Sequence, residues 1–460
     1  MSYNEKSESS RRHCGLNHRR RHFIKQGLSA AGSLLIPIVA SSTQKALYPA
    51  IDARKEIKIG ILFSQSGIMQ IYGRDQLKSA LLAINDINRS GGIHGAKLVP
   101  VIRDPASHWP SYSRYTRELL AQNINFIWGC APSASREATL PVVQRGGALL
   151  FYGVFYEGRE CSPNMIATGA VPNQLTAISI PWMMKLTGKR VYIVGSNYIF
   201  PHTISKQARI NIYQHGGKIV GNQFFSLDQN QEAQFADVVT EIAKLKPDWI
   251  LSNLVGVNTG AFLKAFKKAG LSAQQIPILH TVLMETEVAA IGTEFTEGHY
   301  SSVNYYQTID TSENRDFVKH VQSFSSALLT DTKPTSTVTS IVEGVYLGAM
   351  LHAKAMRRAN SAHPAAVRET ARGMQIKAPS GDVVRIDPEN LHAWLRPRIG
   401  KVNAQGLFDI VYQSPDLIRP EVFNPVMDAQ RSCIDGGRFY IRGTRVKLPR
   451  VTRPIIAQSE

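Results

Sequence analysis

The sequence predicts an α/β protein made of two lobes, each a parallel sheet with helices on both faces. Short apolar runs rich in β-branched residues, such as 57–63 and 190–195, alternate with segments whose apolar residues recur every three or four positions. Repeated units of this length favour parallel sheets with right-handed crossovers. The pattern restarts near residue 190, so two sets of similar size follow one another.

In the first set, the pattern predicts strands at 57–63, 97–103, 126–130 and 148–152, separated by helices at 75–88, 111–121 and 135–145. In the second set it predicts strands at 190–195, 218–225, 248–254 and 277–282, and helices at 204–215, 235–245 and 259–269. A strand at 299–305 and helices at 314–326 and 335–356 follow. Alternating residues then predict a β-meander over 382–387, 396–402 and 407–412.

The net charge of +18 on 460 residues lies mainly at the two ends of the chain. The first 50 residues hold eight Lys or Arg against two Glu, and the last 30 hold seven against two acidic residues. No basic stripe interleaved with aromatic residues occurs between them, which argues against nucleic-acid binding. We interpret residues 426–460 as a basic C-terminal extension that is a surface segment or partly disordered.

The amino terminus has the order of an export signal. Arg20-Arg21 with Phe23-Ile-Lys25 precedes a short apolar run, 27–40, which Pro37 interrupts. A basic segment followed by a short apolar segment and small residues is typical of a secretory signal, and the Arg-Arg-x-Phe-Ile-Lys order favours the twin-arginine route. The run is too short for a membrane span. We therefore expect residues 1–50 to be a signal and linker, and the protein to be periplasmic.

Cysteine and histidine spacing predicts no metal site and no cofactor. Three cysteines remain after the signal, and they do not form a disulfide framework. Cys130 and Cys161 can pair only if their loops meet, and the sequence leaves this open. We predict that Cys130 is a small buried hydrophobic residue.

The segment 129–174 predicts the ligand pocket. Two buried strands end there in loops, one bearing Ser133 and Ser135 and the other Tyr152, Phe155 and Tyr156. Ligands of open parallel sheets bind beyond the carboxyl ends of the strands. The segment has no nucleophile elbow or catalytic triad, so we expect binding without catalysis.

The chain resembles the type I periplasmic binding proteins, in the branch that binds urea and short-chain amides. The resemblance rests on an ordered series of matches over about 57–425: Gly129-Cys130 with Ser133-Ala-Ser-Arg136, Tyr156-Glu-Gly158, Cys161-Ser-Pro-Asn164, Pro172-Asn-Gln174, Gly195-Ser196 with Tyr198 and Phe200-Pro201, Glu313-Asn-Arg315, Lys377-Ala-Pro-Ser-Gly381 and Phe408-Asp-Ile-Val411. It implies two Rossmann-like lobes joined by three hinge strands, which close on a small solute. The implied lobes are 57–172 plus 300–375, and 173–299 plus 376–425.

The resemblance also implies the residues of the ligand site. Ser133 matches a ligand-binding hydroxyl, although Ser is equally common as a helix N-cap. Tyr152, Tyr198 and Phe200 match aromatic ligand positions, with core packing as the alternative role. Glu157 is expected to anchor its loop through backbone N–H groups.

The chain departs from the family pattern at several of these positions. Ala131 replaces a large aromatic residue, Phe155 a polar residue and Met284 a small hydroxyl residue. Val154 stands where amide sensors carry a hydroxyl, as it often does in urea-type members. Each change removes a polar group or enlarges the space. We therefore hypothesise a ligand larger and less polar than urea, either an amide or an amino-acid-like molecule.

These observations predict an exported substrate-binding subunit whose partner is the membrane permease of an ABC importer. An amide-sensing regulatory protein of the same fold is the alternative, and an amidase-like enzyme is the third candidate. The sequence leaves open whether the protein is a monomer or a homodimer.

Overall fold

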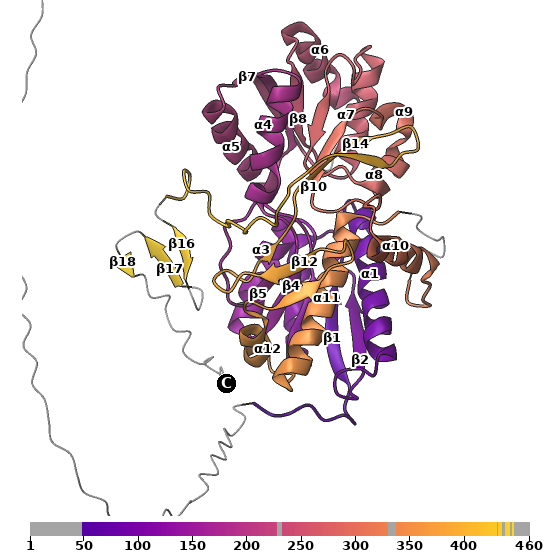
Figure 1. Cartoon of the computed structure of the whole chain (residues 1–460), viewed down its shortest axis with the longest axis vertical. Helices are drawn as coiled ribbons and strands as arrows, with labels where there is room; N and C mark the ends of the chain where they lie inside the picture. The colour runs from indigo at the N-terminus through magenta and orange to yellow at the C-terminus, as the bar shows by residue number, and fades with distance from the viewer. Residues whose placement is uncertain are drawn as a thin grey trace, which may run out of the picture. The chain divides into compact units, whose positions relative to one another are not determined.

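The structure is a computed structural model that describes residues 48–227, 232–329, 337–429, 431–434, 438–441 and 444–445. The predicted export signal therefore lies almost wholly outside the described residues, as does much of the C-terminal extension. Figure 1 shows two sheets in two lobes, the first built mainly from the early part of the chain and the second from the middle. The predicted fold class is confirmed.

Lobe 1 is built on a five-stranded parallel sheet in the order β2-β1-β3-β4-β5. Its strands are β1 (Ile57–Leu62), β2 (Leu98–Arg103), β3 (Phe126–Gly129), β4 (Leu149–Tyr152) and β5 (Met165–Ala167). Its helices are α1 (Gln70–Arg89), α2 (Trp109–Ala121), α3 (Ser133–Arg145), α10 (Ser312–Ser323), α11 (Ser340–Ala359) and α12 (Pro364–Ala371). The central strands are buried on both faces, which explains why they read as continuous apolar runs.

Lobe 2 is built on a seven-stranded sheet in the order β15-β14-β10-β9-β8-β6-β7. The strands β6 (Arg190–Ser196), β7 (Lys218–Phe225), β8 (Trp249–Asn253), β9 (Ile278–His280) and β10 (Tyr300–Val303) run parallel, and β14 (Arg398–Val402) and β15 (Phe408–Gln413) form an antiparallel edge. Its helices are α4 (Thr176–Leu186), α5 (Ile199–Gln214), α6 (Ala236–Leu245), α7 (Val257–Lys268), α8 (Glu285–Ile291) and α9 (Thr293–Thr296).

The structure differs from the predicted lobe boundaries at two places. The strand β10 was assigned to lobe 1 with 300–375, but it pairs with β9 and β14 in the sheet of lobe 2. The small sheet β11 (Gln375–Lys377), β12 (Val383–Ile386) and β13 (Ala393–Trp394) was assigned to lobe 2 with 376–425. It adjoins lobe 1, since Ala167 at the end of β5 bridges to His392. The predicted meander is thus divided between two sheets, because ladder pairing decides where a strand belongs.

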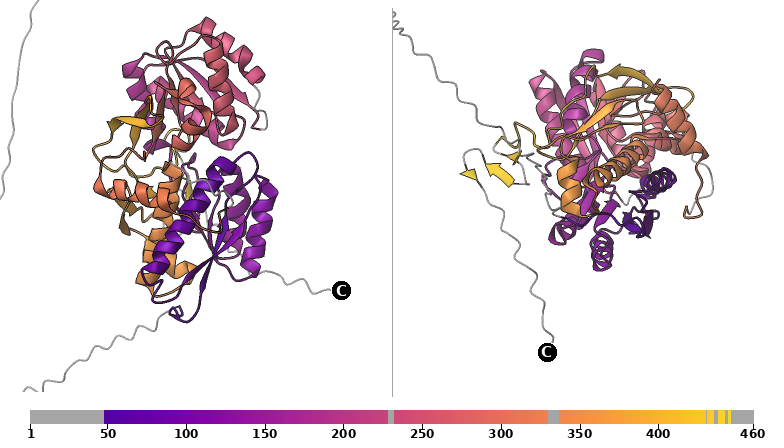
Figure 2. Two further views of the ribbon diagram at one scale, coloured as in Figure 1. Left: turned by 90° about the vertical axis from the view of Figure 1, so that its right-hand side faces the viewer. Right: turned by 60° about the horizontal axis from the view of Figure 1, so that its bottom comes forward.

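Three segments connect the lobes: 168–175 after β5, 304–308 after β10 and 395–397 before β14. The last is fixed to lobe 1 through Asp382, whose carboxylate accepts from Arg396 at 2.8 Å and from Arg398 at 2.9 Å. Figure 2 shows the two lobes one above the other, with the late strands beside their junction.

A disulfide joins Cys161 in lobe 1 to Cys433, with 5.7 Å between the two Cα atoms. The Cys130–Cys161 pair that the sequence left open does not form, and Cys130 is a free, buried thiol. The partner Cys433 lies in β16 (Ser432–Ile434), which continues to β17 (Arg438–Ile441) and β18 (Thr444–Arg445). This part of the C-terminal extension is therefore covalently attached to lobe 1.

Lobe 1 depends on a close approach between the end of β4 and α11. A Cβ on Gly344 would overlap the carbonyl oxygen of Gly153, and a Cβ on Gly153 would lie 2.7 Å from the amide nitrogen of Val345. The backbone contact is reinforced by Thr168, whose hydroxyl donates to the Gly344 carbonyl at 2.7 Å. Two glycines thus let a helix pack directly on the strand end that leads to the pocket.

We expect Gly344→Ala to destabilise the protein by about 1–3 kcal/mol, because the new methyl group meets backbone that has no room to move. Gly348→Ala, one turn later on α11, is the matched control, since its Cβ would meet only the Thr168 side chain, at 3.1 Å. Urea denaturation measures both variants. Equal stability of the two variants would contradict the close approach.

Candidate functional site

A cavity lies between the two lobes, at the carboxyl ends of strands from both sheets. Lobe 1 lines it with Met69, Tyr72, Ala131, Pro132, Ser133, Val154, Phe155 and Ile341, and lobe 2 with Tyr198, Phe200, Val255 and Val282. Its volume is about 30 Å³, well below the roughly 300–1,000 Å³ of small-molecule sites, so a solute enters only when the lobes or the lining side chains move apart. Loops that follow β1, β3, β4, β6, β8 and β9, with the first turns of α1, α3 and α5, supply all of these residues except Ile341 of α11, as expected for open α/β sheets.

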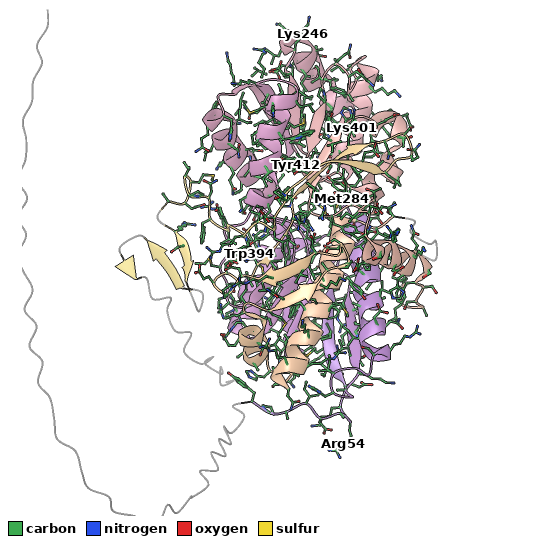
Figure 3. All side chains as sticks on the ribbon, in the orientation of Figure 1. Arg54, Lys246, Met284, Trp394, Lys401 and Tyr412 are labelled. Atoms are coloured by element: carbon green, nitrogen blue, oxygen red, sulfur yellow. A yellow bond between two sulfur atoms is a disulfide. The ribbon has the colours of Figure 1, made fainter. Side chains whose placement is uncertain are left out.

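Six of the eight residues predicted for the site line this cavity: Ala131, Ser133, Val154, Phe155, Tyr198 and Phe200. Tyr152 does not, because it is fully buried and its hydroxyl donates to the Ala131 carbonyl at 2.7 Å. Met284 also lies outside the lining, at the junction of the lobes (Figure 3), where its sulfur accepts from the Ser340 hydroxyl at 3.3 Å. Tyr152 and Met284 therefore support the wall from behind.

Six lining residues were not among the predicted site residues: Met69, Tyr72, Pro132, Val255, Val282 and Ile341. Val255 and Val282 each come two residues after the end of a strand, β8 and β9, so the rule that ligands bind beyond strand ends gave a signal for this region. Met69 lies in the loop after β1 and Tyr72 in the first turn of α1, whereas Ile341 comes from α11, which no local pattern connects to the pocket.

Behind Ser133 lies a buried ion pair between Arg136 and Glu157. Arg136 donates to Glu157 at 2.7 Å, and the side chains are only 4% and 2% exposed. The other carboxylate oxygen accepts from the Ser133 hydroxyl, and the guanidinium lies 4.6 Å from the centroid of the Tyr156 ring. The prediction that Glu157 anchors its loop through backbone N–H groups is wrong, because its carboxylate is committed to two side chains.

The cavity therefore offers few polar groups to a ligand. The first two N–H groups of α3, from Ser133 and Ala134, have no acceptor among the described backbone groups, and Pro132 in the N-cap position supplies none. The Ser133 hydroxyl, having donated its hydrogen to Glu157, presents lone pairs. The Tyr198 hydroxyl has no hydrogen-bond partner within the described ranges. The remaining lining is mostly apolar.

No reactive group stands beside the cavity in the described part of the chain. Burial raises the pKa of the Cys130 thiol to about 12, which leaves it protonated and unreactive. No set of three or more His, Cys, Asp or Glu side chains within the described ranges is placed to hold a metal ion. Among the described helices none is long and apolar enough to cross a bilayer.

Comparison with known proteins gives a consistent result. Residues 57–429 match the family model described as a periplasmic binding protein domain. A Leu/Ile/Val-binding protein of Citrobacter freundii is 23% identical over 239 residues, which are 48% of this chain and 60% of that relative. The chain thus spans less than two thirds of the curated relative that it matches.

Two solved structures illustrate the shared fold. A solute-binding protein of an ABC transporter from R. palustris, in complex with 4-hydroxybenzoate, has a TM-score of 0.70 and 22% identity, covering 79% of this chain and 98% of that one. The substrate-binding protein of a branched-chain amino acid transporter from Streptococcus pneumoniae, in complex with isoleucine, has a TM-score of 0.68 and 18% identity, covering 79% and 100%.

We expect Glu157→Gln to destabilise the protein by about 3–5 kcal/mol, because it leaves the buried Arg136 charge with only the exposed Glu137 carboxylate, at 4.0 Å, as a counter-ion. The exposed pair Arg419–Glu389, at 2.6 Å, is the matched control, and Glu389→Gln should change stability by less than about 1 kcal/mol. Denaturant titration of the two variants measures the difference. Similar losses in both would show that the Arg136–Glu157 pair is not effectively buried.

Stability should also depend on pH through groups near the junction of the lobes. Burial raises the pKa of three glutamates to about 8 and of one aspartate to about 7: Glu285, Glu287, Glu343 and Asp75. The folded protein then binds more protons than the unfolded chain between pH about 4.5 and 8, so stability falls as pH rises through this range. Burial lowers the pKa of His299 and His352 to about 3, so stability also falls as pH drops below about 6.5.

We therefore expect the two effects to oppose each other between about pH 4.5 and 6.5. On the alkaline side, from about pH 6.5 to 8, the melting temperature should fall as pH rises, because only the raised carboxyl pKa values act there. Glu343→Gln should reduce this alkaline fall, which thermal unfolding across pH 5–9 tests. An unchanged alkaline side would show that the pKa of Glu343 is not raised.

Proposed function

We propose that this chain, which belongs to the periplasmic binding protein family, is the substrate-binding subunit of an ABC importer. The family consists of binding proteins and not enzymes, and its location is extracytoplasmic. The observation that carries the proposal is the cavity between the lobes, lined from both sides and without a reactive group beside it. A solute that contacts both lobes stabilises their closed arrangement by its differential affinity for it. The partner is then the membrane permease of the importer, which binds the closed arrangement.

The ligand that best fits the cavity is a small, mostly apolar molecule with one carboxamide group. The free N–H groups at the start of α3 suit a carbonyl oxygen, and the lone pairs of the Ser133 hydroxyl suit an amide N–H. Apolar lining suits a hydrocarbon or aromatic body larger than urea. This pairing supports the urea and amide branch of the family, in its less polar range.

An α-amino acid fits less well, because its ammonium group needs acceptors that are still available. Of the nearby carboxylates, Glu157 is committed to Arg136 and Ser133, and Glu287 to Tyr72 and Met284. An aromatic carboxylic acid is the second candidate. It is favoured by the aromatic wall, in which the Phe155 and Phe200 ring centroids lie 6.1 Å apart.

Thermal shift with matched ligands tests the proposal, because a ligand of the folded state raises the melting temperature by mass action. The pairs are benzamide with benzoate and isovaleramide with isovalerate, alongside leucine, phenylalanine and urea. We expect the amides to give the largest shifts and urea the smallest. Shifts from the carboxylates alone would favour an aromatic carboxylic acid as the ligand. Tight urea binding would contradict the proposal that the ligand is less polar than urea.

The polar end of the site is tested by Ser133→Ala, which removes the lone pairs offered to the amide. We expect amide affinity to fall by about tenfold, the effect of one hydrogen bond. Ser205→Ala is the matched control, since this buried serine bonds Asn253 inside lobe 2, at 2.8 Å.

A regulatory sensor of the same fold is the alternative function. A mature protein that begins after the predicted signal supports the receptor and twin-arginine export, whereas an intact Met1 supports the sensor.

A further inference from the structure

One side chain of lobe 1 forms two hydrogen bonds to lobe 2 at the edge of the cavity. The Tyr72 hydroxyl donates to Glu287 Oε1 at 2.5 Å and accepts from the Gly256 N–H at 3.0 Å. Tyr72 is 5% exposed and Glu287 2% exposed, so water competes little for these bonds. The lobes are therefore in direct polar contact that includes no solute.

Both halves of this contact are set within their own lobes. In lobe 2, the second carboxylate oxygen of Glu287 accepts from the Met284 N–H at 3.0 Å, which fixes the side chain at the start of α8. In lobe 1, a Cβ on Gly73 would overlap the carbonyl oxygen of Ser64, so the first turn of α1 is pressed onto the loop after β1. The bonding groups are thus prepositioned, which lowers the entropic cost of joining them.

A second cross-lobe bond lies beside the first. The Thr286 hydroxyl donates to Asp75 Oδ2 at 2.8 Å. Asp75 follows Tyr72 by three residues on α1, so the two side chains share a helix face, and Thr286 directly precedes Glu287. We call Tyr72, Asp75, Thr286 and Glu287 the α1–α8 latch.

The latch separates two spaces. Tyr72 lines the inner cavity, whereas Glu287 and Gly256 line a larger outer cleft of about 670 Å³, together with Ile71, Val257 and Lys264. A molecule that passes between the cavity and the outer cleft on this side must part Tyr72 from Glu287. The latch therefore lies across an exit path.

We infer that the α1–α8 latch is a solute-independent positioning device that holds the lobes closed and keeps Tyr72 across the mouth of the cavity. None of the latch hydrogen bonds includes a ligand atom. The latch therefore shifts the open–closed equilibrium of the empty protein toward the closed arrangement. The inference goes beyond the proposed function, since it concerns the empty protein and holds whichever solute binds. Tyr72 and Glu287 act as positioning residues that set how long a bound molecule stays.

The test measures the distance between the lobes of the dialysed, solute-free full chain. Spin labels on Arg89→Cys in lobe 1 and Lys246→Cys in lobe 2, both exposed positions, report the open and closed populations by pulsed electron resonance. We expect the parent protein to populate a short, closed distance in the absence of solute. Tyr72→Phe removes both bonds of the hydroxyl, and Thr286→Val removes the bond to Asp75 and the 2.8 Å bond to the Thr337 hydroxyl without touching the cavity lining. Each lost bond should raise the open-to-closed ratio about fivefold.

Tyr192→Phe is the matched control, because its hydroxyl donates to Glu241 at 2.7 Å wholly within lobe 2. The inference is supported if Tyr72→Phe and Thr286→Val populate a longer distance and Tyr192→Phe does not. It is overturned if both latch variants keep the parent distance distribution, or if Tyr192→Phe shifts it equally. Because no ligand is added, either result leaves the outcome of the ligand screen unaffected.

Discussion

The buried ion pair between Arg136 and Glu157 connects the parts of the molecule that form the site. Its carboxylate holds the hydroxyl of Ser133 at the start of α3, and its guanidinium lies against the Tyr156 ring. The backbone carbonyl of Glu157 accepts from Gln207 of lobe 2, at 3.1 Å. One short segment after β4 therefore orients the polar end of the cavity and also contacts the opposite lobe. Because both charges are out of water, they must stay paired, and this requirement fixes the segment.

Local patterns predicted the alternation of strands and helices well, and their failures have physical reasons. The helix α4 was not predicted, because Pro181 lies inside it and proline normally ends a helix. The helix α5 begins at Ile199, five residues before the prediction, with Pro201 in its first turn, where a missing N–H costs little. Which sheet β10 or β12 joins depends on the distant strands with which each of them pairs. Local periodicity carries no information about those partners, so it cannot predict the sheet.

The sequence predicted the position of the site but not all of its lining side chains. Strand ends identified Ser133 and Phe155, because topology places such positions at one edge of a sheet, whereas Val154 and Tyr198 came from the family resemblance. Which neighbouring side chain faces the cavity is decided by packing, so Tyr152 turned behind the wall while Val154 faces the cavity. Tyr72 was missed since its role needs a partner on the other lobe.

The disulfide has a consequence for how this molecule is made. Cys161 and Cys433 are 272 residues apart, so the covalent ring contains the whole of lobe 2 and all three connections between the lobes. Cys433 is synthesised after both lobes, and the ring can close only once lobe 1 has received the end of the chain. Closing so long a loop strongly restricts the unfolded chain. Oxidation of this thiol pair is therefore a late checkpoint in biogenesis, and a faster-migrating band on a non-reducing gel would mark molecules that have completed assembly.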